Sequence, residues 1–209
     1  MQTRLSLLLL ALIAFAVPRA SAVIVFTATL TNNQETTAPV LTLTSGTPRP
    51  VSFGTATLTL NDDMTELTFT ATINNIDVTG NQTADINDNL TNAHIHGPAA
   101  PGTNASVIFG FFGSPNNDVS PSNLVVTPFA SGVGGTFTTT WNVGEGNGGT
   151  TLTAQLPNLL SGQTYLNFHT VQNPGGEIRG QILRVPDPGS SLLLLALGLG
   201  SVVALRRRT

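Results

Sequence analysis

GTATLTLNDDMTELTFTATI, residues 54–73, carries the clearest structural signal in this sequence of 209 residues. Apolar and polar side chains alternate on both sides of the polar segment NDDMT, residues 61–65. A period of two places one kind of side chain on each face of a β-strand, and a short polar segment between two such runs is typical of a hairpin loop. The stretch therefore predicts two antiparallel strands, with Leu58 and Phe69 on the apolar face and threonines on the other.

Further strands are expected on both sides of this hairpin. The segment SVIFGFF, residues 106–112, is a nearly continuous apolar run, as expected of a strand buried on both faces. The alternation is repeated in VFTATL (25–30) and in GTFTTTWNV (135–143), through Phe137, Trp141 and Val143. Two more segments, TYLNFHT (164–170) and GEIRGQIL (176–183), flank the turn residues of VQNPGG.

The connections between these strands are rich in Gly, Asn and Pro. Strands at this spacing predict an antiparallel sandwich or barrel. One short helical turn is expected within LPNLLSG, residues 156–162. We therefore predict an all-β fold with a single domain at residues 23–184.

The first 22 residues have the chemistry of a secretory signal peptide. Arg4 precedes an apolar core from Leu5 to Val17, and the small residues Ala20-Ser21-Ala22 follow. This order of a basic, an apolar and a small-residue part is typical of a cleavable export signal. We therefore expect the domain to be secreted.

The C-terminal segment, residues 185–209, is expected to be a sorting tail. The motif Pro186-Asp187-Pro188 precedes an apolar run from Leu192 to Leu205, and the basic end is formed by Arg206, Arg207 and Arg208. This tail resembles the PEP-CTERM sorting signal of exopolysaccharide-producing Gram-negative bacteria, in which Glu is usual where Asp187 stands. The resemblance implies transient insertion into the inner membrane, removal of the tail by an exosortase, and delivery to the cell surface or extracellular matrix. A permanent single-span membrane anchor is the alternative.

Charge is scarce in the domain, and its sign is negative. Between Val23 and Arg184, three arginines (Arg49, Arg179 and Arg184) stand against ten Asp and Glu residues, a formal difference of −7. A nucleic-acid-binding domain needs basic residues to neutralise phosphates. We therefore expect no nucleic-acid partner.

Three histidines form the most distinctive candidate site. His94 and His96 lie two residues apart, so in a strand both project to the same face, and His169 joins them if its strand lies alongside. Three imidazoles can hold one metal ion. Alternatively, the rings hydrogen-bond to buried backbone or to the Glu177 carboxylate and fix a loop. Because no metal motif such as H-E-x-x-H accompanies them, the spacing alone favours the structural role.

Glu177 and Arg179 lie on one face of the last predicted strand, together with Gln181. The planar guanidinium of Arg179 is suited to a carboxylate, and Glu177 is the nearest candidate on the same strand. We expect a paired structural arginine rather than one that binds an anion. The Asp-rich segment DINDN, residues 85–89, is interpreted as an ordinary polar loop because it lacks the spacing of an EF-hand.

Catalytic motifs are absent from the sequence. It contains no Cys nucleophile, no G-x-S-x-G elbow, and no Walker or Rossmann glycine pattern. A Ser-His-Asp set assembled in space stays open. We therefore expect a noncatalytic protein without a cofactor.

The late motifs of the domain are similar to those of a known family. AHIHGPA, YLNFHT and PGGEIRGQI, in this order, resemble the CHRD domain, which occurs in chordin and in microbial secreted proteins, and residues 53–76 fit its opening strands. The similarity covers Ile24 to Leu183 and departs from the family at Phe168 and in the Gly- and Asn-rich insert at 142–150. It implies an immunoglobulin-like β fold, in which His94, His96, His169, Glu177 and Arg179 form a structural cluster.

Taken with the two ends, this resemblance predicts a noncatalytic component of the cell envelope or exopolysaccharide matrix. Its expected partners are exopolysaccharide or surface proteins, besides the exosortase. A metal-binding enzyme is the alternative, since an H-x-H strand in an all-β domain is faintly similar to copper-zinc superoxide dismutase. That family needs more imidazoles than three and also a disulfide, which this cysteine-free chain cannot form.

Overall fold

The computed structural model of the chain describes residues 23–113, 118, 122–145 and 148–186. The predicted signal peptide lies outside these residues, as do Asp187, Pro188, the apolar run and the three terminal arginines. Pro186, the first proline of the predicted sorting motif, is the last described residue and is exposed. No helix within the described ranges is long and apolar enough to cross a membrane.

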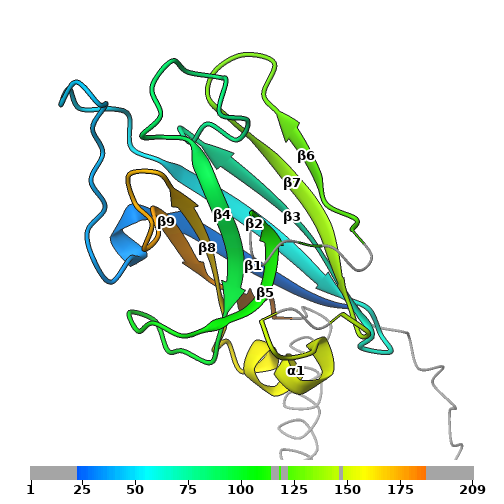
Figure 1. Cartoon of the computed structure of the whole chain (residues 1–209). Helices are drawn as coiled ribbons and strands as arrows, with labels where there is room; N and C mark the ends of the chain where they lie inside the picture. The colour runs from blue at the N-terminus through cyan, green and yellow to red at the C-terminus, as the bar shows by residue number, and fades with distance from the viewer. Residues whose placement is uncertain (1–22, 114–117, 119–121, 146–147, 187–209) are drawn as a thin grey trace, which may run out of the picture.

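The described strands form one curled antiparallel sheet, a half-barrel with a short helix at one end (Figure 1). In space the strand order is β5-β4-β8-β9-β1-β2-β3-β7-β6, and β10 pairs with β1. The elements are β1 (Ile24–Thr31), η1 (Asn32–Gln34), β2 (Phe53–Leu60), β3 (Glu66–Asn74), β4 (Leu90–His96), β5 (Val107–Phe112), β6 (Val125–Pro128), β7 (Gly134–Asn142), α1 (Leu152–Leu160), β8 (Tyr165–Thr170), β9 (Ile178–Gln181) and β10 (Leu183–Arg184).

The predicted antiparallel β architecture is confirmed in its main part, since the fold is mostly β with one short helix, but the strands form one curled sheet, a half-barrel, rather than the two layers of an immunoglobulin-like sandwich. Strand β1 joins the two groups of strands. It pairs with β2 from Ile24↔Leu60 to Thr31↔Phe53, whereas its pairing with β9 is limited to Thr31↔Arg179. Because strand twist accumulates across a long sheet, such a sheet curls and can enclose a core by itself.

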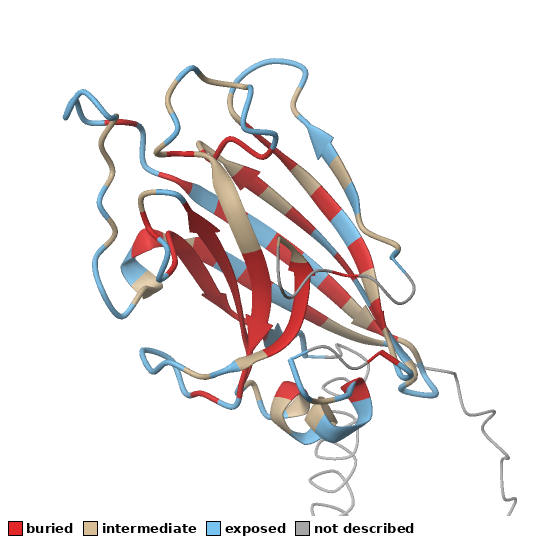
Figure 2. Cartoon of the chain, in the orientation of Figure 1, coloured by how far each residue is buried: buried red, intermediate tan, exposed pale blue. Residues whose placement is uncertain are grey.

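The hairpin predicted from residues 54–73 is confirmed. Strands β2 and β3 pair in one register from Phe53↔Asn74 to Leu60↔Leu67, and the Asn61 amide closes the loop on the Glu66 carbonyl. Leu58 and Phe69 are buried in the core. The alternation of buried and exposed residues along these strands follows the sequence pattern (Figure 2).

Aromatic rings inside the curl bring distant parts of the sheet together. Phe109 of β5 stacks on Trp141 of β7, with ring centroids 4.8 Å apart and planes 10° from parallel. These two strands lie near opposite ends of the strand order, so the sheet wraps around its core. Ile108 to Phe111 are buried throughout, as the apolar run 106–112 predicted.

The helix and the end of β7 differ in extent from the sequence prediction. Helix α1 begins at Leu152, before the predicted turn at 156–162, because the Thr151 hydroxyl accepts a hydrogen bond from the Ala154 amide and caps its first turn. Strand β7 ends at Asn142, where the Glu145 amide bonds back to the Asn142 carbonyl and closes a turn. Val143, expected on the apolar face, is therefore exposed.

Candidate functional site

Strands β4, β8 and β9 have an apolar face toward the core and a second face that carries polar side chains. Both faces are buried: all six residues of β8 and all four of β9 are buried. The strand register sets Asn92 opposite His169, His94 opposite Asn167, and His96 opposite Tyr165. The second face therefore brings polar groups together away from water, where each needs a partner.

His94, His96 and His169 meet on this polar face. Each offers one ring nitrogen such that the three nitrogens lie within 4.8 Å of one another. The side chains are only 7–8% exposed. The ring centroids lie 5.1 Å apart for His94 and His169, and 5.5 Å apart for His94 and His96. The register of β4 and β8 therefore brings the three histidines together, as expected if the strand of His169 lies alongside that of His94 and His96.

Backbone carbonyls define the protonation of two of the rings. His96 Nδ1 lies 2.9 Å from the Ala105 carbonyl oxygen, and His169 Nδ1 lies 3.0 Å from that of Pro174. A carbonyl oxygen can only accept, so Nδ1 carries the proton in both neutral rings and Nε2 carries a lone pair. This is the arrangement in which metal-ligating histidines are usually held.

The remaining ring nitrogens either contact one another or have no hydrogen-bond partner among the described residues. His94 Nδ1 lies 3.3 Å from His169 Nε2, so it donates to that lone pair when no ion is present. His94 Nε2 and His96 Nε2 are buried without a hydrogen-bond partner among the described residues. The predicted hydrogen bonds to the backbone are present for His96 and His169, but two of the ring nitrogens in the cluster still lack a hydrogen-bond partner among the described residues.

Burial keeps all three rings neutral. It lowers the pKa of His94 to about 3, with the neighbouring His169 and His96 lowering it further. It lowers the pKa of His96 to about 4, an effect that the Ala105 carbonyl opposes and that the neighbouring His169 and Arg179 reinforce. The pKa of His169 is also lowered by burial. Neutral imidazole is the form that ligates a metal.

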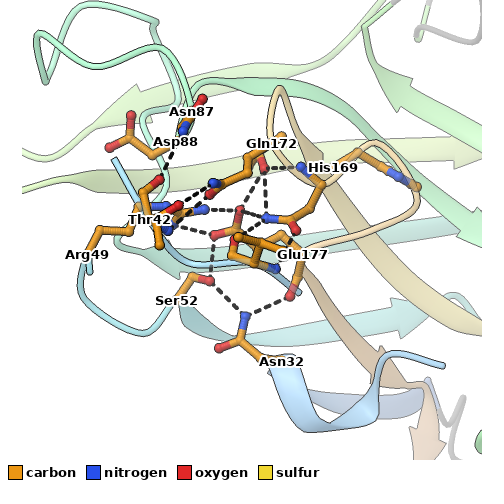
Figure 3. A network of polar contacts seen from close by, with 12 residues as sticks. Asn32, Thr42, Arg49, Ser52, Asn87, Asp88, His169, Gln172 and Glu177 are labelled. Atoms are coloured by element: carbon orange, nitrogen blue, oxygen red, sulfur yellow. Dashed lines mark hydrogen bonds and ion pairs between the residues drawn. The ribbon is translucent and has the colours of Figure 1, made fainter. Parts of the chain in front are cut away.

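Glu177 pairs with Arg49 and not with Arg179, so the predicted partner was wrong. Its carboxylate is fully buried and takes two parallel bonds from the Arg49 guanidinium, at 2.8 and 2.5 Å (Figure 3). Three further donors complete its shell: Ser52 Oγ at 2.6 Å, Thr170 Oγ1 at 2.6 Å and Asn173 Nδ2 at 2.8 Å. Glu177 therefore ties the segment between β1 and β2 to the β8–β9 turn, whose Pro174 carbonyl is hydrogen-bonded to His169 of β8.

Arg179 instead packs on the Tyr165 ring, which separates it from the histidines. Its side chain is buried, donates to Asn104 Oδ1 at 3.0 Å and to the Thr103 carbonyl, and lies with Cζ 3.4 Å from the centre of the Tyr165 ring. Tyr165 in turn stacks on His96, with centroids 4.9 Å apart and planes 3° from parallel. The guanidinium is thus a buried cation beside the histidine cluster.

Sequence reasoning missed Arg49 and Tyr165, as well as Ser52, Thr170 and Asn173, which donate to Glu177. The first two each had a weak signal, since Arg49 is one of three arginines in the domain and Tyr165 is the single tyrosine of the chain. In the Asp-rich loop, the Asp85 carboxylate accepts hydrogen bonds from the Asn87 amide and, outside the loop, from the amide and hydroxyl of Thr44 between β1 and β2.

The fold and the site together define a mostly β protein with a polar cluster buried on one face of its sheet. The sequence matches the CHRD domain over residues 26–182, well over half of the chain. The chain therefore belongs to the CHRD domain family. No curated protein and no solved structure matches it.

Proposed function

We propose that this CHRD domain binds one transition-metal ion through His94, His96 and His169, and that it does so as a noncatalytic module at the cell surface or in the exopolysaccharide matrix. The observation that carries the proposal is the convergence of three ring nitrogens within 4.8 Å at a buried point. The type of ligand also selects the metal: imidazole suits zinc, copper, iron and nickel, whereas magnesium and calcium prefer oxygen.

The hydrogen bonds around the cluster support ligation. The carbonyls of Ala105 and Pro174 fix the tautomers of His96 and His169, so Nε2 carries the lone pair in both rings. A bound ion would replace His94 Nδ1 as the partner of His169 Nε2. Polar atoms buried without a partner are uncommon in folded proteins and are costly. His94 Nε2 and His96 Nε2 are two such atoms, and a bound ion can satisfy at least one of them.

The location and partners rest on the two ends of the sequence. The basic, apolar and small-residue parts of residues 1–22 support export. The Pro-Asp-Pro motif, the apolar run and the arginine end support recognition by an exosortase at the inner membrane. If the protein lies in the extracellular matrix, its partners are exopolysaccharide or surface proteins. The net negative charge of the domain argues against a nucleic-acid partner.

The test is metal binding by purified protein stripped with EDTA. Wild-type protein titrated with Zn²⁺ or Cu²⁺ is expected to bind one ion and to unfold at a higher temperature, because a ligand that binds only the folded state stabilises it. His96→Ala and His169→Ala should lose both effects. Gln181→Ala, on the same polar face but outside the cluster, should keep them. A wild-type melting temperature that no metal changes, together with no binding in the titration, would mean that the histidines are only structural.

A further inference from the structure

We infer that the histidine site selects a monovalent ion, Cu(I), over the divalent Zn²⁺, and that Arg179 sets this preference. The inference rests on the proposed function, since it concerns the same three ligands. It follows from the charges around the cluster, from its enclosure and from the number of ligands.

The ligand set brings no negative charge. All three ligands are neutral imidazoles, and no Asp or Glu belongs to the group of ligand atoms within the described ranges. The charge of a bound ion is therefore not compensated by its own ligands. The cost of burying an ion grows with the square of its charge, so a divalent ion costs about four times as much as a monovalent ion of similar size.

The nearby charges add to this cost. Arg179 is 1% exposed and is linked to His96 by the stacked ring of Tyr165. Its hydrogen bonds go to neutral oxygens, those of Asn104 and Thr103. Glu177, which could offset a cation, is already paired with Arg49. The guanidinium thus has no hydrogen-bonded carboxylate among the described residues, and Glu35, which interacts with it, offsets its charge only in part because burial raises the pKa of Glu35 to about 7. Across the Tyr165 ring, Arg179 repels a doubly charged ion about twice as strongly as a singly charged one.

The number of ligands points the same way. Zinc in proteins is almost always four-coordinate, and sites with three protein ligands complete the shell with water. The histidine side chains are 7–8% exposed, and His94 Nε2 and His96 Nε2 have no contact with solvent. Cu(I) commonly takes two or three ligands, so three imidazole nitrogens complete its shell without a water.

The experiment compares the affinities of the full-length protein for the two ions under anaerobic conditions. Cu(I) affinity is measured by competition with bicinchoninate, and Zn²⁺ affinity by competition with a chromophoric zinc chelator. Wild-type protein is expected to bind Cu(I) at least a hundredfold more tightly than Zn²⁺. Zn²⁺ binding that equals or exceeds Cu(I) binding overturns the inference and leaves the proposed metal site intact. Binding of neither ion overturns both.

The role of Arg179 is tested by removing its charge. Arg179→Gln should narrow the ratio of Cu(I) to Zn²⁺ affinity by about tenfold, because the lost repulsion acts more strongly on the divalent ion. Arg184→Gln removes the same charge from an exposed position and should leave the ratio unchanged. An equal ratio in wild type and Arg179→Gln, with both proteins folded by circular dichroism, would show that Arg179 does not set the preference.

Discussion

Replacing Glu177 by alanine is expected to destabilise the domain by about 3–5 kcal/mol. The carboxylate is fully buried, and its removal leaves the guanidinium of Arg49, whose side chain is itself only 2% exposed, without a counter-charge. Breaking a buried ion pair by removing one partner costs about this amount. The hydroxyl of Ser52 and the amide of Asn173 also lose their acceptor. Since small domains are stable by about 5–15 kcal/mol in total, the variant should be close to unfolding at room temperature.

The assay is urea denaturation at pH 7, read as a shift of the midpoint at constant slope. A double-mutant cycle with Arg49→Ala isolates the pair, and the double variant should be more stable than the sum of the single effects predicts by about 2 kcal/mol. Glu66→Ala removes an exposed glutamate and should change the free energy of unfolding by less than about 0.5 kcal/mol. A loss below about 1 kcal/mol for Glu177→Ala, or strict additivity in the cycle, would refute the reasoning from burial and pairing.

Three further predictions concern the metal-free domain and the ends of the chain. Burial lowers the histidine pKa values below the unfolded value near 6.5, to about 3 for His94 and about 4 for His96. The unfolded chain therefore binds more protons than the folded domain between pH 7 and pH 5, so the free energy of unfolding should fall as the pH drops across this range. Glu35, whose pKa burial raises to about 7, opposes this, and a net loss of about 2 kcal/mol in urea denaturation is expected; equal stability at both pH values would contradict the neutral cluster. Gly176→Ala should cost about 2–3 kcal/mol in the same assay, because φ is +124° and the added Cβ would lie 2.5 Å from Glu35 Oε1; an unchanged midpoint would refute this packing. Protein extracted from the surface of an exosortase-bearing host should lack residues 1–22 and the tail beyond about Pro188 by intact mass, whereas a mass that includes the apolar tail would indicate a permanent anchor.

Local patterns were enough to predict most of the strands, though not β6, and part of the site. The alternation in 54–73 fixes which side chains of β2 and β3 face the core, and the two-residue spacing of His94 and His96 fixes their common face. The turn residues of VQNPGG correctly placed the connection between β8 and β9. Each of these features depends on residues that are close in the sequence.

The features that were missed depend on residues that are far apart in the sequence. Arg49 and Glu177 are separated by 128 positions, so a search for the nearest carboxylate or cation favoured Arg179 instead. The pairing of Asn92 with His169, which brings the third imidazole to the other two, is set by the register of β4 and β8. The choice between one curled sheet and a two-layer sandwich likewise depends on strand order, which period-two patterns do not contain.

X-ray absorption spectroscopy of the metal-loaded protein tests the histidine site most directly. Wild-type protein is expected to show a first shell of about three nitrogens near 2 Å, with the outer-shell scattering of imidazole rings. His169→Ala should lose one imidazole from this shell or fail to retain the metal. A first shell made of oxygen atoms, or one that is the same in wild type and His169→Ala, would contradict a metal centre built from His94, His96 and His169.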